Sequence, residues 1–118
     1  MRRWNVNPLV IAGRLLAADA VRDLIPAPGV GSRLRIFSVS WSIRVAAAQI
    51  VDIGVAAGAA ALQMASIPAS SATPGRVECD TGFILAENTA FSADPVAAGP
   101  EIQFLIEYII EPKSTATA

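Results

Sequence analysis

Residues 38–45, with the sequence SVSWSIRV, alternate between polar and apolar side chains without a break. The odd-numbered positions are apolar and the even-numbered positions are polar, which is the period of a β-strand with one face in a core. We therefore predict a strand in which Trp41 packs in the core. The opposite face carries three small hydroxyl side chains and one arginine, namely Ser38, Ser40, Ser42 and Arg44.

A different phase of alternation precedes this segment and indicates a β-bulge. Leu34 and Ile36 are apolar at even-numbered positions, whereas Phe37 begins the odd-numbered apolar series. One extra residue at this point would change the side-chain register in this way. The other segments that the pattern predicts as strands are residues 48–55, 59–67, 76–79, 82–86, 89–92 and 102–111, and residues typical of turns separate them.

Residues 9–25 fit two kinds of structure. Paired apolar residues at 15/16, 20/21 and 24/25 are compatible with an amphipathic helix. Two short strands, interrupted near residues 17–19, account for the same pattern. The following segment, PAPGVG at residues 26–31, is predicted as a turn.

Seven or eight short strands, with turn signals about every 8–12 residues, predict an all-β fold. We expect an antiparallel β-sandwich, jelly-roll-like in its arrangement, over residues 9–112. Residues 1–8 are expected to form an extended N-terminal arm, and residues 113–118 a short polar C-terminal tail.

The composition indicates one domain with a thin core. The chain has 118 residues, of which 53% are hydrophobic, and a chain of this length buries about two thirds of its unfolded surface. Alanine supplies much of the hydrophobic fraction, however, and only seven residues are aromatic. Domains with thin cores often gain stability by oligomerising.

Charge is unevenly distributed along the chain, although the net charge is −1. Residues 1–76 carry eight arginines and three aspartates, a net charge of +5, whereas residues 77–118 carry one lysine and seven acidic residues, a net charge of −6. Either the two halves interleave in one fold with ordinary surface ion pairs, or complementary faces meet between neighbouring subunits. No basic cluster is dense enough to predict nucleic-acid binding.

No residue pattern typical of catalysis or of cofactor binding occurs. Histidine is absent, and so are phosphate-binding glycine loops and the CxxC motif. Glu107 and Glu111 would lie about 13 Å apart along one strand, too far for the paired carboxylates of a glycosidase, and we expect them to be exposed charges. Cys79 is expected to be a small buried residue. We therefore predict that the protein is not an enzyme and has no catalytic, cofactor-binding or metal-binding residues.

The longest uncharged stretch does not predict a membrane span. It covers the 23 residues between Asp52 and Arg76, and its second half is rich in serine, threonine and proline. A membrane helix needs about 20 predominantly apolar residues. We therefore expect no membrane partner.

Two surfaces are candidates for contacts with other proteins, and the first is the N-terminal arm. Arg2, Arg3 and Trp4 follow the initial methionine, and arginine and tryptophan are the residues that most often dominate interfaces. A terminal strand that tucks its tryptophan into its own sandwich would give the same sequence. The arm is thus either an interface anchor or a strand of the sandwich.

The second surface is the face formed by Ser38, Ser40 and Ser42. A strand that faces water usually carries longer charged side chains, and the only lysine of this chain lies in the tail. A flat face of small residues allows another sheet or subunit to approach closely. We therefore expect this face to pack against another copy of the chain.

Three segments, taken in order, carry a family resemblance: APGVGSRLRIFSVSWSI, a Gly- and Ala-rich middle, and GFILAENTAFS followed by PVAAGPEIQFLIEYII. This order, over residues 23–111, resembles that of small β-sandwich virion proteins of tailed bacteriophages. In that family a strand of the pattern G-x-x-[LI]-R-[IV] opens the sandwich, and a "laenta" segment precedes a closing strand with an aromatic residue. Residues 59–64 depart from the family's usual hairpin. The matching positions are Gly31, Leu34, Arg35, Ile36, Glu87, Asn88, Thr89, Ala90 and Tyr108.

The resemblance implies a structural virion protein that is made in the host cytoplasm and sits on the capsid exterior. It would be a capsid decoration (cement) protein that binds over junctions of the major capsid protein, often as a homotrimer. Arg2, Arg3 and Trp4 would then contact the capsid, and the three serines would contact other subunits. The resemblance also allows a head-fibre or tail-tip module that binds a host-surface receptor through loops 68–76 and 93–100. A bacterial β-sandwich subunit unrelated to phages remains a third possibility, because a sandwich fold alone does not specify function.

Overall fold

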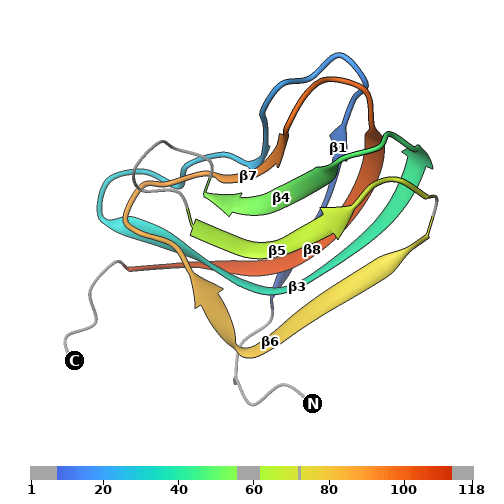
Figure 1. The fold of residues 1–118 in the computed structure, drawn as a ribbon. Coiled ribbons are helices and arrows are strands. Elements are labelled where there is room, and N and C mark those ends of the chain that lie inside the picture. The colour runs from blue at the N-terminus through green and yellow to red at the C-terminus, as the bar shows by residue number, and fades with distance from the viewer. Residues whose placement is uncertain (1–7, 56–61, 72, 113–118) are drawn as a thin grey trace.

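The computed structural model describes residues 8–55, 62–71 and 73–112, and these residues contain eight β-strands and no helix (Figure 1). The prediction of an all-β fold is therefore confirmed. The strands are β1 (Leu9–Leu15), β2 (Arg22–Ile25), β3 (Ser32–Val45), β4 (Ile50–Val55), β5 (Leu62–Pro68), β6 (Gly75–Ile84), β7 (Phe91–Pro95) and β8 (Glu101–Pro112).

The strands form two antiparallel sheets of four. Sheet A has the order β1-β8-β3-β6, and sheet B has the order β2-β7-β4-β5. The pairings are nested: β4 pairs with β5, β3 with β6, β2 with β7 and β1 with β8. Pairings of β3 with β8 and of β4 with β7 complete the sheets. The predicted antiparallel pairing is confirmed, and the two sheets are arranged as in a β-sandwich (Figure 1).

The core lies between the two sheets. The central strands of sheet A, β3 and β8, each contribute alternate residues to it, as the sequence pattern predicts. Trp41 packs against this core and lies over Gly75 of β6, where a Cβ atom would overlap the indole ring. The buried core residues of sheet A are Leu15, Leu34, Ile36, Val39, Ile43, Ile102, Phe104 and Ile106, and those of sheet B are Leu24, Ile25, Val51, Ile53, Val55, Ile67, Phe91 and Ala93.

The segment 9–25, which fitted either a helix or two strands, forms the strands β1 and β2. Seven residues of β1 pair with β8 in continuous register, which no helix could do. The interruption between the strands is a turn closed by Asp19, whose backbone N–H donates to the carbonyl of Leu16. The Asp19 carboxylate in turn accepts a hydrogen bond from the Leu16 N–H at 2.8 Å. The helical alternative is therefore wrong.

The predicted bulge in β3 is confirmed. The register of β3 shifts between Ile36 and Ser38 against both of its neighbours. Ile36 and Val39 are both core residues. Two residues, Phe37 and Ser38, therefore lie between them, where a regular strand would have one. We expected Phe37 to share the core face of Val39, and this detail is wrong. Phe37 is buried but lies outside the core cluster, close to Gly82 of β6.

The segments expected at 76–79 and 82–86 are one strand, β6, rather than two. Ser38 pairs with Glu78, and Ile36 pairs with Phe83, so β6 holds extra residues opposite the bulge of β3. Gly82 has a φ of +88°, a conformation that glycine adopts without strain. Gly82 therefore lets the strand bend and continue instead of ending.

The other predicted segments have narrower or shifted bounds. Strand β4 lies within the predicted 48–55, and β5 begins three residues later and ends one residue later than the predicted 59–67. Strand β8 extends the predicted 102–111 by one residue at each end. The expected turn at Gly58 lies outside the described residues, and so do the tail 113–118 and all of the arm except Pro8.

Candidate functional site

The candidate contact residues of the arm, Arg2, Arg3 and Trp4, lie outside the described residues. The other candidates, Ser38, Ser40 and Ser42, lie on β3, which is flanked by β8 and β6 in sheet A. The candidate site is therefore the outer face of sheet A, on the side opposite the core.

The three serines of β3 lie in three different environments. Ser38 is buried, and its hydroxyl donates to the carboxylate of Glu107 on β8 at 2.8 Å. Ser40 is half-buried and accepts a hydrogen bond from Arg76 of β6 at 2.8 Å. Ser42 is exposed. The hydroxyls of Ser38 and Ser40 are thus bonded to neighbouring strands, whereas Ser42 lies at an open surface.

An open hollow of about 340 Å³ lies on the outer face around Ser40 and Ser42. Four of its eight lining residues are alanine, glycine or serine, whose short side chains leave room for the hollow. Leu105, which pairs with Ala12 across β8 and β1, is 50% exposed at this hollow. The lining contains no charged residue and consists of Ala12, Gly13, Ser40, Trp41, Ser42, Gln103, Phe104 and Leu105.

Charged side chains next to the hollow form a network across β6 and β8. Arg76 donates to the Glu78 carboxylate at 2.6 Å and lies 4.0 Å from the carboxylate of Glu107. Glu107 in turn accepts the hydrogen bond from Ser38. One arginine therefore links β3, β6 and β8 on their outer side.

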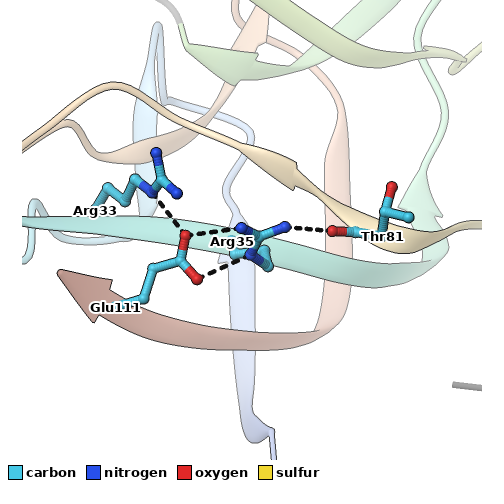
Figure 2. Close-up of polar contacts among 4 residues, drawn as sticks. All are labelled: Arg33, Arg35, Thr81 and Glu111. Atoms are coloured by element: carbon cyan, nitrogen blue, oxygen red, sulfur yellow. Dashed lines mark hydrogen bonds and ion pairs between the residues drawn. The ribbon is translucent and has the colours of Figure 1, made fainter. Parts of the chain in front are cut away.

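A second polar cluster lies toward the other end of β3 and β8 (Figure 2). The guanidinium of Arg35 donates two hydrogen bonds to the carboxylate of Glu111, at 2.9 and 3.0 Å, and Arg33 donates a third at 2.6 Å. Arg35 also donates to the backbone carbonyl of Thr81 in β6. Paired donors of this kind form the strongest charge-assisted hydrogen bonds in proteins. The cluster therefore ties β3 to both of its neighbours.

The environment of Glu111 acts on its pKa in two opposite directions. Burial would raise the pKa of this carboxyl group, but the hydrogen bonds and positive charges of Arg35 and Arg33 outweigh that effect. The pKa of Glu111 is therefore lowered from its ordinary 4.5. Our expectation that Glu107 and Glu111 are exposed charges is wrong, because both are partly buried and bonded.

Gly82 makes room for the second cluster. A Cβ atom at this position would overlap the side chain of Arg35, which passes over Gly82 on its way to Thr81 and Glu111. Sequence reasoning missed this cluster because its members are separated by 46 to 78 residues. The available signal was the even spacing of Arg33 and Arg35, which places both on the strand face opposite Leu34.

The described residues contain neither a cluster of metal ligands nor a helix that could cross a membrane. Within them, no three His, Cys, Asp or Glu side chains gather in a way that could hold a metal ion. Cys79 is a free, half-buried thiol. Across the described residues, no helix is long and apolar enough to cross a membrane.

Comparisons with known proteins do not assign the chain to a family. No protein-family model matches it, and no curated protein matches it significantly.

Proposed function

We propose that the protein is a structural component of a virion, a capsid decoration (cement) protein that binds over junctions of the major capsid protein on the outside of a phage head. The observation that carries this proposal is the outer face of sheet A. This face combines an uncharged hollow with two partly exposed apolar side chains, Leu105 in the lining of the hollow and Val10 on the neighbouring strand β1. Such a face suits contact with other protein surfaces.

The nested strand pairing supports a jelly roll as the finer description of the fold. A jelly roll has eight strands in two sheets and two Greek keys, and it is common in viral capsid proteins. Pairings of β1 with β8, β2 with β7, β3 with β6 and β4 with β5 are those of a long hairpin rolled into two layers. Lectins and cupins use the same architecture, so the fold alone does not specify the function.

Two of the segments that carry the resemblance to phage virion proteins contact each other. The N–H of Gly31 donates to the Glu87 carboxylate at 2.6 Å, and the N–H of Gly29 donates to the Asn88 side-chain oxygen at 2.9 Å. The matching motifs thus have a shared structural role in joining loop 26–31 to loop 85–90. This contact supports their interpretation as features of a fold rather than of an active site.

The protein in this proposal acts as a homotrimer without enzymatic activity. Ser40 and Ser42 border the hollow and would lie in the contact between subunits, and Ser38 would support it through Glu107. Glu111, the carboxyl group with a lowered pKa, is bonded to two arginines and is suited to holding strands together. Arg2, Arg3 and Trp4 would contact the major capsid protein.

The proposal is tested by purifying the phage particles whose genome encodes the chain and identifying their proteins by mass spectrometry. We expect the protein in intact heads, in a fixed stoichiometric ratio to the major capsid protein. Its consistent absence from purified heads would contradict the proposal. Its recovery only with tails or fibres would instead favour the receptor-binding module.

Deletion of residues 1–8 tests the role of the arm. We expect the truncated protein to keep the unfolding midpoint of the full chain but to bind less well to heads stripped of the protein. Occupancy equal to that of the full chain would show that the arm does not anchor the protein. An arm in which only Trp4 is replaced by alanine separates the aromatic contact from the two arginines.

A further inference from the structure

Loop 26–31 presents an apolar tip to solvent. Val30 at this tip is 86% exposed, and Pro26 and Ala27 are exposed beside it. The loop contains no charged residue. A Cβ atom placed on Gly29 would have no other described part of the chain within 4 Å. The side-chain positions at the tip of the loop are therefore open to solvent.

Hydrogen bonds on both sides of Val30 hold this tip in place. Gly29 donates to Asn88 and Gly31 donates to Glu87, so the backbone on each side of the valine is fixed to loop 85–90. The N–H of Asn88 also donates to the carbonyl of Ser32 at 2.8 Å. A loop that is already ordered loses little conformational entropy when it binds. The tip is thus a preorganised apolar knob.

The hollow of sheet A matches this knob in size and polarity. Its lining is uncharged, and its volume of about 340 Å³ has room for a valine side chain together with adjoining backbone. The knob and the hollow of one molecule lie near opposite ends of β3, because Ser32 follows the loop and Ser42 borders the hollow. Ten residues of strand separate them by roughly 30 Å. A molecule therefore cannot place its own knob in its own hollow.

One side of the hollow carries positive charge, and an acidic side chain lies beside the knob. Arg14 lies opposite Gln103, a lining residue of the hollow, and Arg44 donates a hydrogen bond to the same residue. Neither arginine forms an ion pair with any described residue. Beside the knob lies an acidic side chain, Glu87. A neighbouring copy would thus bring negative charge to the side of the hollow that Arg14 and Arg44 border, away from the carboxylates of Glu78 and Glu107.

We propose that loop 26–31 of one copy inserts Val30 into the hollow of the next copy. This inference rests on the self-association in the proposed function and names the two surfaces that meet. The knob lies at an end of the sandwich and the hollow lies on its face, so the contact is heterologous, between two different patches. Heterologous contacts close into rings when successive rotations return to the start, and patches on adjoining sides of a subunit permit a ring of few members.

The first test measures the molar mass of Val30→Asp by light scattering behind a sizing column. We expect the wild-type chain to form a trimer and the variant to dissociate at concentrations roughly tenfold or more higher, because an aspartate replaces one buried valine at each contact. Val96→Asp is the matched control, because Val96 is 81% exposed in the loop between β7 and β8 and belongs neither to the knob nor to the lining of the hollow. Val96→Asp is expected to keep the wild-type unfolding midpoint at the same protein concentration, and Val30→Asp is expected to match the midpoint of wild-type protein diluted until it is monomeric.

Disulfide trapping tests the same contact directly. In a Cys79→Ser background, Val30→Cys combined with Ser42→Cys is expected to give covalent dimers and trimers under oxidation, whereas Val96→Cys with Ser42→Cys is expected to stay monomeric on a non-reducing gel. Equal crosslinking in both pairs would overturn the proposed contact. So would a Val30→Asp protein that remains as trimeric as the wild type.

The outcomes separate this inference from the proposed function. A trimeric wild type that is insensitive to Val30→Asp overturns the knob-and-hollow contact and leaves the homotrimer standing. A wild type that is monomeric at every concentration overturns both the contact and the trimer in free solution. The cement role itself is decided independently, by the presence or absence of the protein in purified heads.

Discussion

The two halves of the outer face of sheet A use the same two strands in different ways. Toward loop 26–31, long charged side chains of β3 and β8 bond to each other, with Arg35 and Glu111 at the centre (Figure 2). Toward the other end of the same strands, short side chains such as Ser42 border an uncharged hollow. One half is completed within the molecule, and the other presents a surface that a second molecule can complete.

Strand alternation determines which face of the sheet a residue occupies but not what that face does. Side-chain length decides the second question. Arginine and glutamate reach across neighbouring strands and satisfy one another, so the charged half stabilises the monomer. Ser42 and Ala12 are too short to bond to side chains of neighbouring strands, so this end of the face contributes little to the monomer and remains available for assembly. Substitutions in the two halves are therefore expected to affect different measurements.

The largest effect on stability is expected from Glu111→Ala. The side chain of Glu111 is 14% exposed, and its removal takes away the carboxylate that accepts hydrogen bonds from both Arg33 and Arg35. Removing one partner of a largely buried ion pair destabilises proteins strongly, and we expect a loss of about 2 to 3 kcal/mol in the free energy of unfolding. Urea denaturation of the purified protein measures this loss.

The control is Glu78→Ala, which removes a carboxylate from the Arg76 pair. The Glu78 side chain is 62% exposed, and exposed pairs contribute about 0 to 1 kcal/mol. Equal losses in the two variants would show that the Arg33, Arg35 and Glu111 cluster is no more than a surface ion pair.

Acid is expected to weaken the charged half selectively. The pKa of Glu111 is lowered in the folded protein by Arg35 and Arg33 despite its burial. Its contribution to stability is therefore complete above its ordinary pKa of 4.5 and is lost as the pH falls through the lower folded-state value. Unfolding free energies measured from neutral to acidic pH should fall less steeply for Glu111→Gln than for the wild type. Identical slopes would exclude Glu111 as a source of acid sensitivity.

Gly82→Ala is expected to destabilise the same half by about 2 kcal/mol. Its methyl group would overlap the side chain of Arg35, and its backbone has a left-handed conformation with a φ of +88°. The matched control is Gly29→Ala, because Gly29 also has a positive φ but nothing lies within 4 Å of a Cβ placed there. That variant is expected to lose about 1 kcal/mol from backbone strain alone. The difference between the two midpoints in urea isolates the clash with Arg35.

Much of the fold could be predicted from local patterns. The alternation of residues 38–45 and of β8, and the change of phase at the bulge, are direct consequences of which side chains face the core. Residues 9–25 could not be assigned, because paired apolar residues satisfy a helix and two strands equally well. The pairing of β1 with β8 decides between them, and that pairing joins segments about ninety residues apart.

The candidate site was less predictable for the same physical reason. Arg35 meets Glu111 and Thr81 only because three strands lie in one register and β6 bends at Gly82. The sequence pattern predicts a break between residues 79 and 82, whereas Gly82 allows one continuous strand to pass beneath the side chain of Arg35. Sequence alternation placed the three serines on one face correctly, but it could not distinguish a buried serine from an exposed one.

The smallest effects are expected at the serines, and they mark the boundary between the two halves. Ser38 is buried and donates to Glu107, so Ser38→Ala leaves a carboxylate without one donor and is expected to cost about 1 kcal/mol. Ser42 is exposed, and Ser42→Ala is expected to change the free energy of unfolding of the monomer by less than about 0.5 kcal/mol. Urea denaturation at low protein concentration, with the Val30→Asp substitution present in both variants, measures these monomer terms without a contribution from assembly. A loss at Ser42 as large as that at Ser38 would mean that the hollow is part of the monomer's own structure, and the division of the face into a closed half and an open half would then be wrong.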